Sequence, residues 1–141
     1  LHRSTPFKQT QIQPVIGSET VLDDADIREM SLFLPQGCAL SLDMRGERRL
    51  GPDVLFDHPE LWPDEVIVMS LDRVGTSHGP DFGRLASVCD QAGGRAVFAA
   101  GGVRGFTDLA EIGALGCGAL VSSVLHNGGL DRAQWDRLCD L

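Results

Sequence analysis

Five short apolar runs, separated by stretches with helical periodicity, constrain the fold of this chain more than any other feature. Near-continuous apolar strands that alternate with helices are typical of a parallel sheet covered on both faces. The spacing of roughly 24 to 30 residues from one run to the next suits the units of a (β/α) barrel. The predicted strands lie at residues 14–18, 38–43, 65–72, 95–100 and 118–122.

The length of the chain, 141 residues, limits how much of a barrel it can form. A complete eight-unit barrel usually needs at least about 200 residues. We therefore predict an α/β fold in which the chain forms roughly half of a parallel (β/α) barrel of the TIM type, with a compact open α/β sheet as the alternative. Residues 1–12 have no clear period and are interpreted as a tail or the remnant of a missing element, and residues 13–141 as the half-barrel.

The net charge limits the kinds of partner that the chain can bind. A charge of −8 opposes binding to nucleic acid or to an anionic membrane, because both need a basic face. A few backbone amides and one arginine can still hold a small phosphorylated ligand. No apolar run approaches the ~20 residues of a membrane span, and the N-terminus lacks the apolar region of a signal peptide. We therefore predict a cytoplasmic protein.

The cysteines and histidines give no sign of a metal site. The four cysteines are widely scattered and form no Cys-x-x-Cys pair. We predict buried or half-buried thiols in a reducing cytosol, rather than disulfides or metal ligands. His78 and His126 have no second ligand at a fixed spacing, so neither a metal nor another cofactor is predicted. The cysteines are Cys38, Cys89, Cys117 and Cys139.

A glycine pair between a strand and a helix is the strongest local sign of function. Residues 95–104 read Arg-Ala-Val-Phe-Ala-Ala-Gly-Gly-Val-Arg, and a helical segment begins at Phe106. Glycines at the carboxyl end of a strand let backbone N–H groups approach an anion closely. The helix N-terminus adds a partial positive charge. Gly101 and Gly102 are therefore predicted to bind a phosphate, with a plain tight turn as the alternative.

Two serines at the end of the last predicted strand supply a second wall for this site. Ser122 and Ser123 precede a short His-Asn-Gly segment at residues 126–128. Active-site groups of a parallel barrel gather at the carboxyl ends of its strands. We therefore expect the backbone amides of these serines to face the same phosphate as the glycine pair.

Three segments resemble the HisA/HisF family of histidine-biosynthesis barrels in their order and roughly in their spacing. They are Ser70–Gly79, Ala99–Val103 and Ser122–Gly128. The similarity covers residues 13–141 and matches the C-terminal half of that barrel. It implies a small phosphorylated substrate of the phosphoribosyl-aminoimidazole type, acted on by an isomerase such as HisA or a cyclase such as HisF, without a metal or redox cofactor.

The resemblance also implies site residues. Asp43 lies in an Asp-Met-Arg sequence similar to the family's strand-five Asp-x-Arg, and it ends a strand, where barrel active sites lie. It is the predicted acid/base residue; pairing with Arg45, or capping of the following turn, is the alternative. Thr76 is the second predicted catalytic residue, through a hydrogen bond to the substrate; a turn hydroxyl is the alternative. The predicted substrate loop contains Asp72, Arg73 and Gly75.

The sixth-strand motif departs from that of the isomerases, which is approximately Thr-Asp-Ile-Asp-Arg-Asp-Gly-Thr. Here Met69 replaces the first threonine, Ser70 the next aspartate and Val74 the aspartate before the glycine. Asp72 and Arg73 match the motif and are interpreted as a pair that fixes the loop. Two hypotheses follow: an enzyme with isomerase-type acid/base chemistry, and a non-catalytic or differently specific paralogue that binds a phosphorylated metabolite.

Half of a barrel leaves two open sheet edges and an apolar inner face, which carry a risk of aggregation. We predict that two copies of the chain associate as a homodimer that closes one barrel, or that a missing N-terminal half completes it. The other predicted partner is the small phosphorylated substrate; no nucleic-acid or membrane partner is predicted.

Overall fold

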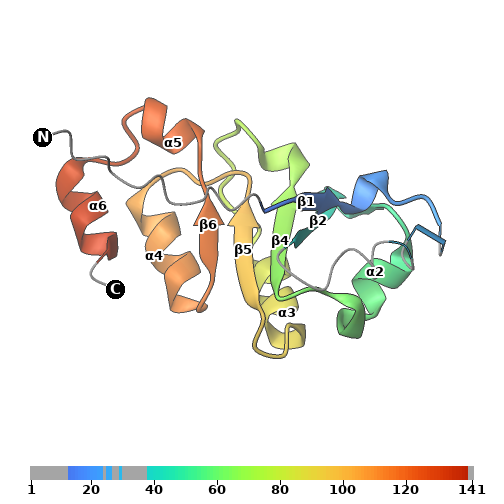
Figure 1. Ribbon diagram of the computed structural model, residues 1–141. Helices are drawn as coiled ribbons and strands as arrows, with labels where there is room; N and C mark the ends of the chain where they lie inside the picture. Colours follow the sequence, from blue (N-terminus) through green and yellow to red (C-terminus); the bar gives the residue numbers. More distant parts are fainter. Residues whose placement is uncertain (1–12, 24, 27–28, 30–37, 140–141) are drawn as a thin grey trace, which may run out of the picture.

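A parallel sheet forms the centre of the structure, a computed structural model that describes residues 13–23, 25, 26, 29 and 38–139 (Figure 1). Its parallel strands are neighbours in the order β1-β2-β4-β5-β6. The five predicted strands are confirmed, each within a few residues of its predicted bounds. They are β1 (Val15–Gly17), β2 (Ala39–Arg45), β4 (Glu65–Ser70), β5 (Ala96–Ala100) and β6 (Gly118–Leu120).

A sixth strand, β3 (Arg48–Leu50), is not predicted from the sequence. It pairs antiparallel with the end of β2, where β2 runs on beyond its pairing with β1. The two strands are joined by a turn of two residues, Gly46 and Glu47. The sequence Arg-Arg-Leu has no apolar alternation, so this strand depends on the free edge that the end of β2 offers.

Helices α2, α3 and α4 pack on one face of the sheet (Figure 1). The main core joins strand residues such as Leu42 and Val68 to Leu55 of α2, Leu85 of α3 and Ile112 of α4. Full burial of one such side chain is worth about 1.5–3 kcal/mol. The described helices are α2 (Asp53–Asp57), α3 (Phe82–Gln91), α4 (Phe106–Ala114), α5 (Ser123–His126) and α6 (Arg132–Cys139).

The helical periodicity of the sequence predicts helices at residues 81–91, 106–115 and 130–141 and a short helix within residues 53–61. The structure has α3, α4, α6 and α2 in these ranges, whereas α5, directly after the last predicted strand, is not predicted. A further helix is predicted from residue 23 to about residue 34, and most of it falls outside the described residues. No helix in the described part of the chain is long and apolar enough to cross a bilayer.

The strand order is that of consecutive units of a TIM-type barrel. In a doubly wound sheet the order reverses at a switch point and helices cover both faces. Here the parallel strands keep their order along the chain, and α2, α3 and α4 share one core cluster with a single face of the sheet. The parallel α/β architecture is therefore confirmed.

The opposite face of the sheet carries a much smaller cluster. Ala39, Ile67 and Ala100 are buried there, and Met69 and Phe98 pack against them. In a TIM-type barrel this face points inward. The sequence predicts helices on both faces of the sheet. In the described part of the chain, the helices that contribute to the main core all lie on a single face.

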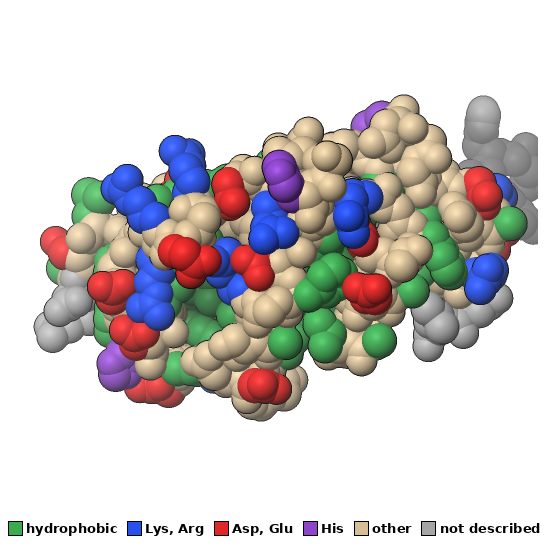
Figure 2. Space-filling view, turned by 180° about the vertical axis from the view of Figure 1, so that it is seen from behind, with side chains coloured by type: hydrophobic (Ala, Val, Ile, Leu, Met, Phe, Trp, Pro, Cys, Tyr) green, Lys and Arg blue, Asp and Glu red, His purple; other side chains and the backbone are tan. Residues whose placement is uncertain are grey.

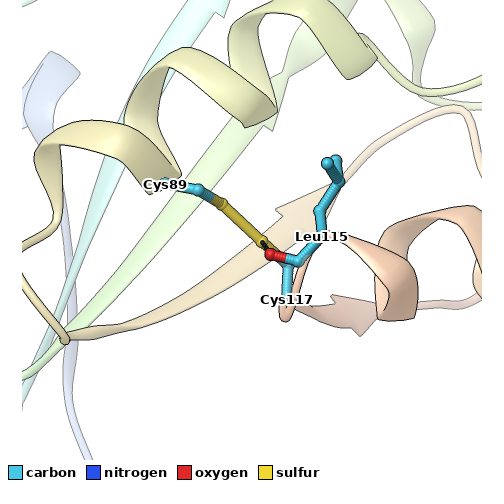
Figure 3. The surroundings of a disulfide bond; sticks show 3 residues. All are labelled: Cys89, Leu115 and Cys117. Carbon is cyan, nitrogen blue, oxygen red and sulfur yellow. Dashed lines mark hydrogen bonds between the residues drawn. A yellow bond between two sulfur atoms is a disulfide. The ribbon is translucent and has the colours of Figure 1, made fainter.

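Two of the four cysteines meet in space. Cys89 of α3 and Cys117, in the turn before β6, are joined in a disulfide (Figure 3). The prediction of separate thiols is wrong for this pair, because the sequence does not show that α3 and this turn lie side by side. Cys38 is buried, and burial raises the pKa of its thiol.

Candidate functional site

A pocket of about 590 Å³ lies at the carboxyl ends of β4, β5 and β6. Its walls are residues 74–77, 100–104 and 120–123, together with Met69 and Asn127. Barrel enzymes carry their active sites at this edge, and the volume is usual for a small-molecule site. The predicted site residues that line the pocket are Gly75, Thr76, Gly101, Gly102, Ser122 and Ser123.

Gly101 and Gly102 form the turn that leads from β5 into the pocket wall. Their φ angles are +97° and +81°, a region that favours glycine. A Cβ on Gly101 would lie 2.5 Å from the carbonyl oxygen of Ser70, and a Cβ on Gly102 would lie 2.5 Å from that of Gly79. The glycines are therefore required by the turn and by the neighbouring loop, and this requirement is compatible with a phosphate cradle.

Three backbone N–H groups of the pocket wall have no acceptor among the described residues. Within residues 38–139, no oxygen accepts a hydrogen bond from the N–H of Gly102, Val103 or Ser122. Neighbouring backbone N–H groups in a turn form concave sites for anions. The wall can therefore donate to a phosphate from both β5 and β6.

Among the described residues that line this pocket, only Arg104 carries a positive charge. The carboxylate of Asp108 accepts from its backbone N–H (2.8 Å), its Nε (2.9 Å) and one terminal nitrogen (2.7 Å). These bonds lower the pKa of Asp108 and raise the pKa of Arg104. Asp108 is only 3% exposed, whereas the Arg104 side chain is 52% exposed. Since a guanidinium has five N–H donors, three of them remain for a ligand.

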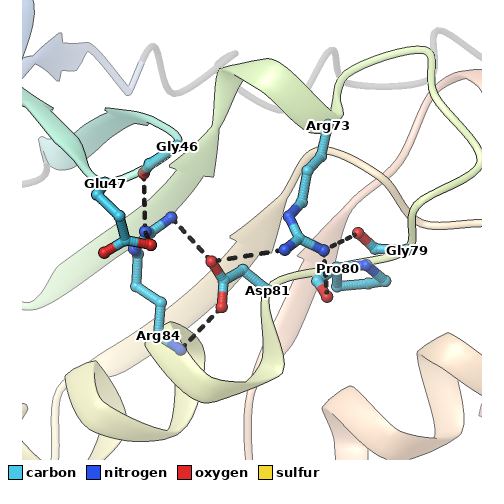
Figure 4. A network of polar contacts seen from close by, with 7 residues as sticks. All are labelled: Gly46, Glu47, Arg73, Gly79, Pro80, Asp81 and Arg84. Carbon is cyan, nitrogen blue, oxygen red and sulfur yellow. Dashed lines mark hydrogen bonds and ion pairs between the residues drawn. The ribbon is translucent and has the colours of Figure 1, made fainter.

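A network around Asp81 holds the loop between β4 and α3 (Figure 4). Arg73 donates to the carbonyl oxygen of Gly79 (2.9 Å), so it ties the two ends of the loop together. Arg84 donates to the carbonyl oxygen of Gly46 (2.9 Å) and lies 3.0 Å from the Asp81 carboxylate. One wall of the pocket is therefore fixed by side chains that lie outside the pocket lining.

Asp72 and Arg73 both fix this loop, but not as the predicted pair. The carboxylate of Asp72 accepts from the backbone N–H of Gly46, which lowers the pKa of Asp72. Arg73 pairs instead with Asp81, at 3.9 Å. Neither Asp72 nor Arg73 lines the pocket.

Thr76 reaches the pocket from the same loop. Its hydroxyl donates to the carbonyl oxygen of Arg73 (2.9 Å) and accepts from the N–H of His78 (3.4 Å). The hydroxyl therefore stabilises the turn. A hydroxyl has two acceptor lone pairs, so one remains for a ligand.

Asp43 stands at the carboxyl end of β2 and is 5% exposed. The Ser41 hydroxyl donates to its Oδ1 (2.6 Å), the backbone N–H of Glu19 makes a long contact with Oδ2 (3.4 Å), and its own N–H donates to the Ser18 hydroxyl (2.9 Å). The alternative of a pair with Arg45 is not observed, since no cation of the described residues forms an ion pair with Asp43.

The register of the sheet connects Asp43 to the pocket. Asp43 lies beside Met69 of β4, Met69 beside Ala100 of β5, and Ala100 beside Leu120 of β6. We call these four residues the mouth row. Met69, Ala100 and Leu120 line the pocket, and Asp43 lies one strand beyond it.

A second hollow, of about 530 Å³, lies between α2 and α3. Acidic and basic side chains are interspersed on the side of the molecule that Figure 2 shows. The charges at the rim of this hollow are compensated within the protein, so they offer a charged ligand no unpaired partner. The pairs are Arg84 with Asp81 and Glu47, and Arg49 with Asp53 and Asp57.

Sequence reasoning does not single out several residues of the site. The spacing of Arg104 and Asp108, four residues apart at the start of a helix, is a signal that could have found this pair. Ser18 and Ser41 give no such signal, because their contacts with Asp43 depend on the fold. Within the described residues, no group of three or more His, Cys, Asp or Glu side chains could hold a metal ion.

Comparison with models of protein families identifies a family for this chain. A protein-family model described as "Histidine biosynthesis protein" matches residues 10–131. This range contains Asp43 and every segment of the pocket wall, and it confirms the resemblance to the HisA/HisF family. A search of curated proteins finds no match.

Proposed function

The chain belongs to the histidine biosynthesis protein family, and we propose that it binds a phosphorylated metabolite at the carboxyl ends of β5 and β6. The observation that carries this proposal is the pocket wall. It combines the N–H groups of Gly102, Val103 and Ser122, which donate to no oxygen of the described residues, with the guanidinium of Arg104. No Asp or Glu of the described residues lines the pocket, so a phosphate meets donors and one cation there without a carboxylate to repel it.

We further propose that Asp43 performs isomerase-type acid/base chemistry on a sugar phosphate of the phosphoribosyl-aminoimidazole type. An Amadori-type rearrangement needs one group to protonate the sugar ring oxygen and another to move the proton at C2. Among the described residues, only the backbone N–H of Glu19 contacts Oδ2 of Asp43, at 3.4 Å, so Oδ2 is the oxygen suited to exchange a proton with substrate.

The second acid/base group of such a reaction lies outside this pocket. No carboxylate or imidazole lines the pocket in the described part of the chain. We propose that a second copy, or a preceding half of the barrel, closes against the open edges of β1 and β6 and supplies the group. Val15 of β1 and Leu120 of β6 are 55% and 48% exposed. A single species of 15.2 kDa in sedimentation would contradict association of two copies.

A binding protein without catalysis is the second candidate function, and Met69 favours it. In the mouth row, Met69 lies between Asp43 and the rest of the pocket. A thioether transfers no proton, and the Asp43 carboxylate lies one strand beyond Met69, outside the pocket lining. In this case the chain keeps the phosphate site and has no turnover.

Titration of the protein with inorganic phosphate, followed by calorimetry, tests the site itself. Ser123→Asp places a carboxylate in the wall and is expected to abolish binding. Ser87→Asp, on the exposed side of α3, is the matched control and should leave binding unchanged. Binding that survives Ser123→Asp would contradict the proposed phosphate site.

A turnover assay with a phosphoribosyl-aminoimidazole substrate separates the two candidate functions. The enzyme hypothesis predicts turnover that Asp43→Asn removes while phosphate binding stays. The binding-protein hypothesis predicts phosphate binding and no turnover in the unmodified protein.

A further inference from the structure

We propose that the Cys89–Cys117 disulfide is a redox switch: its reduction by a dithiol weakens phosphate binding in the pocket. The inference rests on the proposed phosphate site and concerns the elements that support its walls. The disulfide joins α3 to the turn before β6 (Figure 3). Neither cysteine lines the pocket, so an effect of reduction passes through the elements that carry the walls.

The two elements that the disulfide joins support two different walls of the pocket. At the start of α3, Asp81 accepts from the backbone N–H of Arg84 and pairs with Arg73, so it anchors the loop that brings residues 74–77 to the pocket. The strand β6 leads directly into residues 120–123 of the other wall. The disulfide therefore links the support of one wall to the support of the other.

The strand β6 is a short strand at the edge of the described sheet. It is three residues long and, among the described strands, pairs only with β5. Segments of this kind open locally at a low free energy, and a cross-link restricts the open states. Ser122, whose N–H belongs to the proposed phosphate site, lies five residues after Cys117. Opening of β6 after reduction therefore displaces part of the phosphate wall.

The reduced pair of thiols also fits the fold. Both cysteine side chains are partly buried and pack against the main core, where a thiol behaves as a small apolar group. The carbonyl oxygen of Leu115 lies 3.7 Å from Sγ of Cys117, so it can accept from the thiol that reduction forms. Reduction should therefore leave the protein folded and change how firmly β6 is held.

The reduction is a thiol–disulfide exchange in two steps. One thiolate of the dithiol attacks one sulfur of the disulfide. The bond between the two cysteines breaks, a mixed disulfide forms, and the other cysteine leaves as a thiolate that takes up a proton. The second thiolate of the dithiol then attacks the mixed disulfide, forms the disulfide of the reductant and releases the first cysteine. Two electrons and two protons pass from the dithiol to the protein.

Calorimetry with inorganic phosphate tests the inference on the oxidised protein and on protein reduced with dithiothreitol. We expect reduction to lower the affinity about fivefold or more, as is usual for coupling between two sites, while circular dichroism shows that both forms are folded. Cys117→Ser should have the affinity of the reduced protein, with or without dithiothreitol. Cys38→Ala, at a buried cysteine outside the pocket, is the matched control and should respond to reduction as the unmodified protein does.

Phosphate should in turn protect the disulfide, because the coupling of two binding equilibria is reciprocal. In a buffer of reduced and oxidised dithiothreitol, saturating phosphate should shift the protein toward its disulfide form by the factor by which reduction weakens phosphate binding. Labelling of the free thiols after an acid quench measures this shift, with chloride at the same ionic strength as the control.

The failure of the inference and the failure of the proposed function give different results. Equal phosphate affinities of the oxidised and reduced proteins would overturn the inference and leave the phosphate site intact. Unfolding on reduction would also overturn it, because the disulfide would then serve stability alone. If phosphate binds neither form, the proposed phosphate site is wrong and the inference fails with it.

Discussion

Two buried aspartates lie at the same edge of the sheet, Asp43 near the carboxyl end of β2 and Asp108 in the helix after β5, and their surroundings differ. Asp108, at the start of α4, is held by three hydrogen bonds from Arg104. Asp43, at the end of β2, is bonded by the Ser41 hydroxyl and a backbone N–H, and no cation of the described residues pairs with it. Both are at most 5% exposed.

The difference shows that burial alone does not identify a catalytic carboxylate. The guanidinium that lowers the pKa of Asp108 keeps this carboxylate ionised at neutral pH, and Asp108 in return holds Arg104 at the pocket. Asp43 has no such counter-ion, so a proton can be exchanged there without breaking an ion pair. The first aspartate is therefore suited to build the site, and the second to act in it.

Asp43→Asn is the strongest test of this difference. The change keeps the shape of the side chain and removes the carboxylate to which the enzyme hypothesis assigns proton exchange. We expect kcat to fall by about 10²–10⁴-fold, the usual contribution of a general acid or base, with the affinity for inorganic phosphate within about twofold. Steady-state kinetics and calorimetry measure the two quantities. An equal loss of kcat and phosphate affinity would show that Asp43 acts in binding.

Arg104→Gln tests the role of Arg104, the ion-pair partner of Asp108, in phosphate binding. We expect the affinity for inorganic phosphate to fall roughly ten- to a hundredfold, the range for a charge-assisted hydrogen bond, as measured by calorimetry. Arg132→Gln is the matched control. Arg132 also pairs with an aspartate four residues later, Asp136, at 2.9 Å, but on α6 and outside the pocket. Equal effects of both changes would contradict a specific role of Arg104.

Asp108→Asn tests whether the Arg104–Asp108 ion pair stabilises the fold, through the pH dependence of the free energy of unfolding. Because the folded pKa of Asp108 is lowered, its stabilisation is present above the unfolded pKa of about 3.9 and is lost as the pH falls through the folded value. At pH 7, Asp108→Asn should lower the free energy of unfolding by roughly 1.5–3 kcal/mol. Below about pH 4 the difference from the unmodified protein should shrink.

Denaturant unfolding at several pH values measures this difference. A loss of stability that is the same at pH 7 and at pH 2.5 would contradict the ion pair as its cause. The same experiment with Asp136→Asn, at the exposed pair on α6, should show a change below about 1 kcal/mol, as is usual for surface pairs.

Ser41→Ala is expected to have the smallest effect. The Ser41 hydroxyl donates to the Asp43 carboxylate and positions it, so kcat should fall roughly three- to tenfold, in line with the net contribution of one hydrogen bond. Ser41→Thr keeps the hydroxyl and should restore kcat, whereas Ser41→Val, of similar size, should not. Restoration of kcat by Ser41→Val would assign Ser41 a packing role only.

Features set by neighbouring residues could be predicted from the sequence. The strands follow from apolar runs, and the wall of the pocket follows from Gly101 and Gly102, whose place between a strand and a helix is visible in the chain. Ser122 and Ser123 are also local to the end of a strand, and all four residues line one pocket.

Features set by contacts between distant residues could not be predicted. The bond between the N–H of Asp43 and the Ser18 hydroxyl joins residues 25 positions apart, and the Cys89–Cys117 disulfide joins residues 28 positions apart. The strand β3 depends on an edge that exists only once β2 is in the sheet. The position of Asp43 outside the pocket lining follows from the sheet register, which the apolar runs alone do not determine.

The most direct test of the phosphate site is a titration of the ¹⁵N-labelled protein with inorganic phosphate, followed by amide NMR. We expect saturable shifts of the Gly102, Val103 and Ser122 amides, which have no acceptor in the described part of the protein. The amide of Gly94, in the turn between α3 and β5 at the opposite edge of the sheet, should not move. Shifts confined to other residues, or no saturable shift at these three amides, would contradict a phosphate site between β5 and β6.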